Sequence, residues 1–124
     1  MANILTLGEI MLRLSTTLGD RIAHSSMFAA HYGGGEANVA ISLANFGHRV
    51  SFASKVPENA LGDAVFQHLR SYGVDCRHVL RGGSRLGTYY IETGIGERAA
   101  RGVYDRAGSS FAQMKENEWQ SDLF

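Results

Sequence analysis

The spacing of apolar residues changes several times along the first half of the chain, and each change predicts an element. Residues 3–15 begin with a short apolar run, which favours a buried strand over a helix. Gly8 follows this run and marks the point where the strand opens into the next segment. Residues 16–32 are mainly polar and predict no regular element. From Gly35 onward apolar residues recur at helical spacing, and Gly47 lies where a left-handed C-terminal cap belongs.

A second strand and a second helix follow in the same order. Residues 49–56 show a two-residue alternation of side chains with a bias toward β-branched and aromatic types, which is typical of a strand. Pro57 ends this strand. In residues 64–72 apolar side chains recur three and four positions apart, and Gly73 follows them. This pattern predicts a helix of about ten residues with the same cap. The strand–helix–strand–helix order predicts a parallel sheet with right-handed crossovers, an α/β architecture of the doubly wound kind.

Short strands without intervening helices are expected in the next segment. Residues 77–81, 86–93 and 99–106 have strand character and are separated by glycine-bearing turns, which predicts an antiparallel ribbon. Residues 107–124 resemble the start of further structure.

The two faces of this ribbon carry different candidate residues. By the two-residue period of a strand, Tyr89 and Tyr90 lie on opposite faces, while Tyr104 and Arg106 lie together on one face of the next strand. Both faces mix apolar and polar side chains, so neither is a plainly solvated face. We expect one face to cover a ligand and the other to cover a partner.

The composition narrows the class of protein. The 124 residues include 12 basic and 12 acidic residues, and this neutral balance excludes a nucleic-acid binder that works through whole-surface charge. No apolar run approaches the ~20 residues of a membrane span and no signal pattern begins the chain, so we expect a cytoplasmic protein without a membrane partner. The single cysteine, Cys76, can form no internal disulfide, and we expect its thiol to be inert.

Charge is unevenly distributed along the chain. Residues 70–106 hold seven arginines against four acidic residues, a local net charge of +3, and the remainder of the chain carries −3. Such an excess fits a small anionic ligand, but scattered and solvated arginines would give the same pattern.

The strongest local feature is a run of three glycines, Gly33 to Gly35, that leads directly into the first helix. Residues without Cβ let a ligand approach the backbone, and free amides at a helix N-terminus attract oxygen-rich or anionic groups. The run lacks both the G-x-G-x-x-G order of dinucleotide-binding proteins and the Lys-Ser/Thr of a P-loop. A tight turn without a ligand explains the glycines equally well, and Asn38 points either back toward this turn or into solvent.

Metal and nucleophile sites find little support in the sequence. The five histidines share no three- or four-residue helical spacing and Cys76 has no second thiol, so no metal site is expected. No serine lies in a G-x-S-x-G elbow, which disfavours a nucleophilic triad.

Several motifs, taken together and in order, resemble one known family. They are Gly8-Glu9, the glycine run with Glu36-Ala37-Asn38-Val39-Ala40, Leu43-Ala44 before Gly47, Leu61-Gly62-Asp63, Tyr72-Gly73-Val74 and the glycine-broken strands. Their combination resembles the N-terminal part of the ribokinase-like (PfkB-type) sugar kinases, and most closely the 2-keto-3-deoxygluconate kinases. The resemblance implies that residues 1–124 form the N-terminal part of one ribokinase-like domain. That part would be an incomplete doubly wound parallel sheet with a small β lid inserted at residues 77–106, and the ATP-binding C-terminal half would be absent.

The resemblance also implies a set of substrate contacts. In the family the glycine turn and the asparagine after it contact the sugar, and in the ketodeoxygluconate kinases two lid tyrosines and an arginine bind it as well. The matching substrate-binding residues here are Gly33, Gly34, Asn38, Tyr89, Tyr104 and Arg106. The planar fork of Arg106 suits the carboxylate of a sugar acid, although an edge-strand arginine that blocks aggregation is the alternative. The family's lid often forms a dimer clasp, so a homodimer through the lid is expected.

Two departures from the family pattern change the expectation. Many of these kinases hold sugar hydroxyls with an aspartate shortly after the first strand, whereas the matching position is Arg13, a donor-only cation that disfavours a ribose-type substrate. The catalytic D-T-x-G-A-G-D segment, whose last aspartate is the general base, does not occur in the 124 residues. We therefore expect no catalytic, ATP-binding or metal-binding residue in this chain, and no activity of the chain alone.

The expected function of the complete protein is ATP-dependent, Mg²⁺-assisted phosphorylation of a sugar acid such as 2-keto-3-deoxygluconate. Fructose or another sugar is the alternative substrate, and a truncated, non-catalytic association module is the alternative class of function. The α/β order alone would also fit a nucleotide-binding oxidoreductase, but the glycine pattern is wrong for one.

Overall fold

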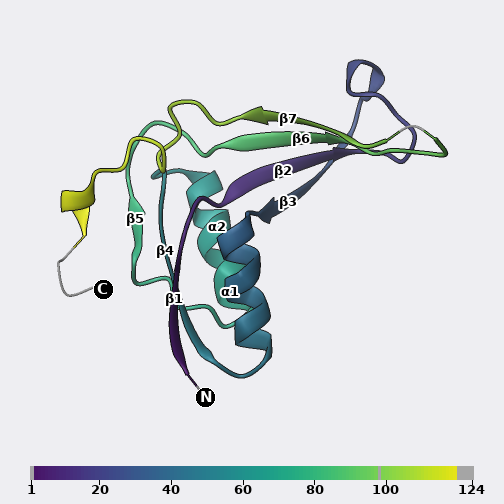
Figure 1. Cartoon of the computed structure of the whole chain (residues 1–124). Coiled ribbons are helices and arrows are strands. Elements are labelled where there is room, and N and C mark those ends of the chain that lie inside the picture. The colour runs from purple at the N-terminus through teal and green to yellow at the C-terminus, as the bar shows by residue number, and fades with distance from the viewer. Residues whose placement is uncertain (1, 98, 120–124) are drawn as a thin grey trace.

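The structure, a computed structural model, describes residues 2–97 and 99–119 and contains a parallel sheet and a second, mixed sheet (Figure 1). The parallel sheet has the strand order β1–β4–β5, with β4 in the centre. Its strands are β1 (Asn3–Leu7), β4 (Arg49–Val56) and β5 (Val79–Arg81), and the helices between them are α1 (Gly35–Asn45) and α2 (Ala60–Ser71). The α/β class and the parallel pairing expected from the sequence are confirmed.

Both helices lie on the same side of the parallel sheet (Figure 1). The core between the two layers is built around Phe52 of β4, with Val65 and Leu69 from α2 and Ala37 and Ala40 from α1, all fully buried. The alanines present only a methyl group, so the first turns of α1 lie close to β1 and β4. No helix in the described part of the chain is long and apolar enough to cross a membrane.

The two helices end in the same way. At the end of α1, Gly47 (φ 91°) donates to the Ala44 carbonyl at 3.0 Å, and the next amide donates to Leu43 at 3.2 Å. Gly73 (φ 81°) closes α2 with the equivalent pair of hydrogen bonds. These Schellman-type ends confirm both predicted caps. Helix α2 begins earlier than the apolar pattern predicts because Asn59 accepts hydrogen bonds from two amides of its first turn.

The second sheet, which we call the lid sheet, extends away from the parallel sheet (Figure 1). Its strand order is β3–β2–β6–β7, and its strands are β2 (Met11–Thr16), β3 (Phe28–Gly33), β6 (Thr88–Glu92) and β7 (Arg101–Asp105). Strand β2 pairs antiparallel with β3 and parallel with β6, and β6 pairs antiparallel with β7. Short 3₁₀ turns occupy Ile22–His24 and Glu116–Glu118.

The lid sheet differs from the predicted ribbon in the strands that it contains. Residues 77–81 are not a lid strand, because β5 lies there and pairs parallel with β4, with Val79 buried in the main core. The run 3–15 is divided between β1 and β2, which belong to different sheets. Residues 16–32, for which no element is predicted, include most of β3, a largely exposed strand held by its pairing with β2. The antiparallel prediction is confirmed for β6 and β7.

Candidate functional site

An open cavity of about 800 Å³ lies between the carboxyl end of β1 and the segment that follows β7. Gly34, Gly35 and Glu36 line it from the start of α1, together with Glu9 from the link between β1 and β2, and Arg106. Ligands of open α/β sheets bind beyond the carboxyl ends of the strands, and the cavity has this location. We therefore take it as the candidate site.

The glycine turn packs against the protein's own backbone on one side. A Cβ on Gly34 would lie 2.2 Å from the Glu9 carbonyl oxygen, a distance that no side chain tolerates. A Cβ on Gly35 would meet only open space. Gly34 is also the N-cap of α1 and gives no side-chain acceptor to the first-turn amides. Close packing thus accounts for Gly34, while the face of the turn at Gly35 is left open.

Three of the predicted substrate-binding residues converge beside this turn. A Cβ built on Gly33 would lie 3.6 Å from Oδ1 of Asn38 and 3.8 Å from the hydroxyl of Tyr89. Of the two orientations left open by the sequence, the Asn38 side chain takes the one toward the turn, although the residue remains exposed. The amide and the phenol hydroxyl together offer donors and acceptors suited to sugar hydroxyls.

The other two predicted lid residues continue from Tyr89 across the sheet. Tyr89 and Tyr104 are direct partners in the β6–β7 register, and their rings stack with centroids 5.4 Å apart and an interplanar angle of 18°. The guanidinium carbon of Arg106 lies 5.4 Å from the centroid of the Tyr104 ring. A cation over an aromatic face is held electrostatically while its N–H groups stay available. Of the six predicted residues, Gly34 and Arg106 line the cavity, while Gly33, Asn38, Tyr89 and Tyr104 lie beside it without being among its lining residues. The role of all six in binding stays a prediction.

A seventh residue, Glu9, links this side of the lid to the rest of the site. Its Oε2 accepts a 2.7 Å hydrogen bond from the hydroxyl of Ser109, and its Oε1 lies 3.7 Å from Nη1 of Arg106. The Glu9 side chain is only 11% exposed, and Ser109 is almost completely buried. The hydroxyl of Ser109 also accepts from the amide of Ala112. Glu9 thus fastens the segment after β7 to the link between β1 and β2.

Sequence reasoning did not assign a role to Glu9. Gly8-Glu9 forms part of the family resemblance, but its partner Ser109 is 100 residues away and lies outside any motif. Glycine at position 87 is a structural signal for the same contact, because a Cβ there would lie 2.5 Å from Oε2 of Glu9. This reason for a glycine at position 87 can be recognised only from the structure, in which Gly87 and Glu9 lie side by side.

His68 and Cys76, which both lie outside the cavity, have shifted pKa values. Burial, followed by the charge of His31, lowers the pKa of His68, whose ring lies between Tyr32 and Tyr72. Burial raises the pKa of the Cys76 thiol, which keeps it protonated and agrees with an inert cysteine. Among the described residues no three histidine, cysteine or acidic side chains gather to hold a metal ion.

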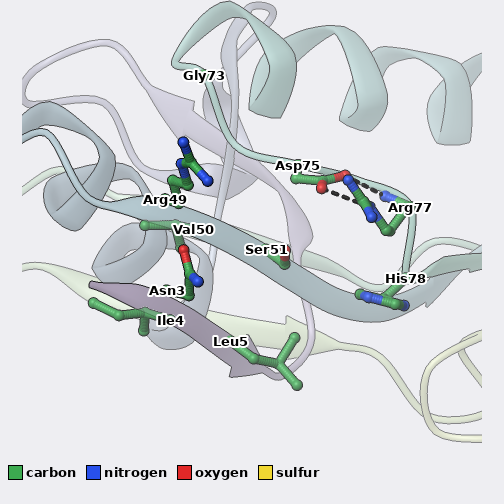
Figure 2. A pocket seen from close by; sticks show the side chains of 10 residues that line it. All are labelled: Asn3, Ile4, Leu5, Arg49, Val50, Ser51, Gly73, Asp75, Arg77 and His78. Carbon is green, nitrogen blue, oxygen red and sulfur yellow. Dashed lines mark hydrogen bonds and ion pairs between the residues drawn. The ribbon is translucent and has the colours of Figure 1, made fainter. Parts of the chain in front are cut away.

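A second cavity, of about 530 Å³, lies over the amino-terminal parts of β1 and β4 (Figure 2). The connection from Gly73 to His78 forms its other wall, and within that wall Nε of Arg77 lies 2.7 Å from Oδ2 of Asp75. Figure 2 shows this ion pair at the edge of the cavity. The glycine turn and the predicted lid residues do not line this cavity, so it is not the candidate site.

The Glu9–Ser109 contact gives a stability prediction. Glu9→Ala should lower the free energy of unfolding by about 1–3 kcal/mol, because the buried Ser109 hydroxyl loses its acceptor. Glu9→Gln keeps an acceptor oxygen and should retain most of the stability. The matched control is Glu36→Ala, which removes an exposed carboxylate from the same cavity. Urea denaturation of the four proteins measures the effect, and equal losses for Glu9→Ala and Glu36→Ala would contradict it.

Comparison with known proteins gives the chain a family. Residues 1–122 match the model of the pfkB family of carbohydrate kinases. The chain is 34% identical over 122 residues to the 2-dehydro-3-deoxygalactonokinase of Haloferax volcanii, an alignment that covers 98% of this chain and 38% of that protein. Among relatives of this kind the chain spans about two fifths of the full length.

Solved structures agree with this assignment. The 2-dehydro-3-deoxygluconokinase of Thermotoga maritima superimposes with a TM-score of 0.93 at 43% identity, covering 97% of this chain and 37% of that one. A sugar kinase of Pyrococcus horikoshii solved in complex with ATP shares the fold, with a TM-score of 0.86 at 22% identity over 96% of this chain and 39% of its own. The match over nearly the whole chain, at this similarity in sequence and structure, shows that it belongs to the pfkB family of carbohydrate kinases.

Proposed function

We propose that this chain is the sugar-binding and lid part of a kinase that transfers a phosphoryl group from ATP to a sugar acid, with 2-keto-3-deoxygluconate as the leading substrate. The observation that supports this most directly is the placement of Tyr89, Tyr104 and Arg106 on one face of the lid sheet, beside the glycine turn. The relatives at 34% and 43% identity are named as kinases of deoxy sugar acids, which agrees with an acidic substrate.

Recognition of the acid rests on Arg106. Its side chain is 54% exposed, and its neighbours are the Tyr104 ring on one side and the Glu9 carboxylate 3.7 Å from Nη1 on the other. These two contacts restrict the orientation of the guanidinium but leave N–H groups directed to solvent. A carboxylate accepts two parallel hydrogen bonds from such a fork, whereas a neutral sugar offers no matching charge.

The lid sheet has the form required to shield a reaction from water. Tyr89 reaches from β6 to the glycine turn, so a sugar bound beside this contact would be covered on one side by the lid and on the other by α1. Exclusion of water lets the phosphoryl group pass to the sugar hydroxyl and not to solvent. In this proposal the chain binds and covers the substrate.

ATP and Mg²⁺ belong to the proposed full-length enzyme and not to this chain. The glycine turn offers no phosphate-binding lysine, and one of its faces is filled by the Glu9 carbonyl. The general base of the D-T-x-G-A-G-D segment is also not among the 124 residues. When bound, ATP supplies the transferred group and Mg²⁺ neutralises charge on it. No residue described here holds either one.

We also propose that two copies of the chain associate through the outer face of the lid sheet. By register, this face carries Phe28, Tyr90 and Val103, of which Phe28 and Val103 are 37% and 52% exposed. Phe28 and Tyr90 meet edge to face with centroids 5.9 Å apart. An exposed apolar surface on a thin sheet is a common site of association, and a second copy of the same face would cover it symmetrically.

The acid-recognition proposal predicts a selective defect. Arg106→Ala in the full-length kinase should raise KM for 2-keto-3-deoxygluconate by about ten- to a hundredfold, because a charge-assisted contact is lost, and change KM for fructose much less. Steady-state kinetics with both sugars measure this. Arg101→Ala, on the opposite face of the same strand, is the matched control. An equal rise in KM for both sugars in Arg106→Ala would show that Arg106 does not bind the carboxylate.

Because the proposal assigns the ATP site to the other part of the enzyme, we expect this chain not to bind ATP. The 124-residue chain should show no ATP binding in isothermal titration calorimetry, with or without Mg²⁺, because the residues that hold ATP lie in the other part of the proposed enzyme. Micromolar binding of ATP would mean that the nucleotide site has been assigned to the wrong part of the protein.

The association proposal predicts that a charge on the outer face separates the two copies. Val103→Glu should shift the chain from dimer to monomer in sedimentation velocity, because a carboxylate would be buried without a partner. Tyr104→Glu, the next residue on the same strand but on the other face, should leave the dimer intact. A wild-type chain that sediments as a monomer at all concentrations would disprove the proposal.

A further inference from the structure

One row of side chains crosses the whole lid sheet. In the register of the three strand pairs, His31 of β3 lies opposite Arg13 of β2, Arg13 beside Tyr89 of β6, and Tyr89 opposite Tyr104 of β7. Register partners in a sheet direct their side chains to the same face. The four side chains therefore share the face that carries Arg106, and Arg13 lies between His31 and Tyr89.

This face is the one that looks toward the glycine turn. The Tyr89 hydroxyl lies close to Gly33 and to Oδ1 of Asn38, so its ring fixes which side of the sheet faces the site. Arg13 is the neighbour of Tyr89 on the next strand, with adjacent strands about 4.8 Å apart. Its side chain thus starts from the middle of the lid, on the side where the substrate is proposed to bind.

Arg13 is a partly buried arginine without an ion-pair partner among the described residues. Its Nε is buried and has no hydrogen-bond acceptor, and no acidic side chain of the described residues lies within ion-pair distance. Other arginines are matched with carboxylates: Arg77 with Asp75, Arg81 with Asp63, Arg85 with Asp105 and Arg106 with Glu9. A buried donor without an acceptor costs free energy comparable to a lost hydrogen bond. A ligand that offers an acceptor to this donor would recover that free energy.

The surroundings of Arg13 indicate what that acceptor is. The acidic residues of the lid strands, Glu92 and Asp105, belong by register to the opposite face. The register partners of Arg13 are His31 and Tyr89, and neither is an acidic residue. A ligand bound on this face of the lid sheet would supply the missing acceptor through an anionic group or a carbonyl oxygen.

We propose that Arg13 is a second substrate-binding cation, which binds the acidic end of the sugar acid together with Arg106 and thereby sets the preference for 2-keto acids over neutral sugars. This proposal rests on the proposed function. Strands β2 and β7 are two strand spacings apart, about 10 Å, so the two arginines can approach one sugar acid from either side of the tyrosine pair. The guanidinium of Arg13 donates to carboxylate or keto oxygens and has no acceptor for a sugar hydroxyl.

Kinetics of the full-length kinase test the proposal. Arg13→Met should raise KM for 2-keto-3-deoxygluconate by about tenfold or more and leave KM for fructose unchanged or lower, because only the acid loses a charge-assisted contact. Arg13→Lys keeps the charge without the fork and should recover part of the loss. Arg101→Met is the matched control, since Arg101 lies on the same sheet but on the opposite face. It should leave both KM values unchanged.

A spectroscopic reading does not depend on turnover. In ¹⁵N-labelled full-length kinase, the Nε–Hε signal of Arg13 should move when 2-keto-3-deoxygluconate is added and should not move with fructose, while that of Arg101 stays in place. This reading also covers the case in which Arg13→Met fails to fold. An unmoved Arg13 signal at saturating sugar acid would overturn the inference.

The outcomes separate this inference from the proposed function. If the wild-type enzyme shows no preference for the sugar acid over fructose, the proposed function itself is wrong. If the wild-type enzyme prefers the acid and Arg106→Ala removes that preference while Arg13→Lys and Arg13→Met preserve it, the proposed function holds and the role of Arg13 is refuted. Equal effects of Arg13→Met and Arg101→Met would also refute it.

Discussion

The candidate site depends on the close packing of residues 8–10, where the chain leaves the parallel sheet and enters the lid. The amide of Gly8 still donates to Ala53 of β4, Ile10 is buried in the core, and the Glu9 carbonyl lies against Gly34. The Glu9 carboxylate at the same time holds Ser109. Since each contact comes from a different part of the chain, these three residues fix how the lid sheet lies relative to the glycine turn.

Local patterns account for the parts of the fold that the sequence predicts. The helix ends at Gly47 and Gly73 depend only on backbone conformation within a few residues, which glycine reveals directly. The two-residue period places Tyr104 and Arg106 together, and the structure agrees: Arg106 directly follows β7, and its guanidinium lies over the Tyr104 ring. Identification of the site residues needed the family resemblance as well, since tyrosines on a strand are compatible with many surfaces.

Long-range pairing accounts for what the sequence does not predict. Strand β3 is largely exposed and has little apolar alternation, so only its pairing with β2 defines it. The parallel pairing of β2 with β6 joins residues more than 70 positions apart, and nothing local in either strand indicates it. Residues 77–81 have strand character, but whether they join the ribbon or the main sheet is decided by burial of Val79 against the core.

The arginine excess of residues 70–106 shows that ion pairing decides how much positive charge is available to a ligand. Arg81 and Arg106 are paired with Asp63 and Glu9, two carboxylates from outside this segment, so part of the local excess is neutralised within the fold. Arg13, whose buried Nε has no such partner among the described residues, lies outside that segment. A cation attracts a ligand in proportion to the charge left uncompensated around it, and net charge along a segment does not report that quantity. In the proposed role of this lid, affinity for an acid would therefore depend on the positions of Arg13 and Arg106, on either side of β6, and not on the number of arginines in the ribbon.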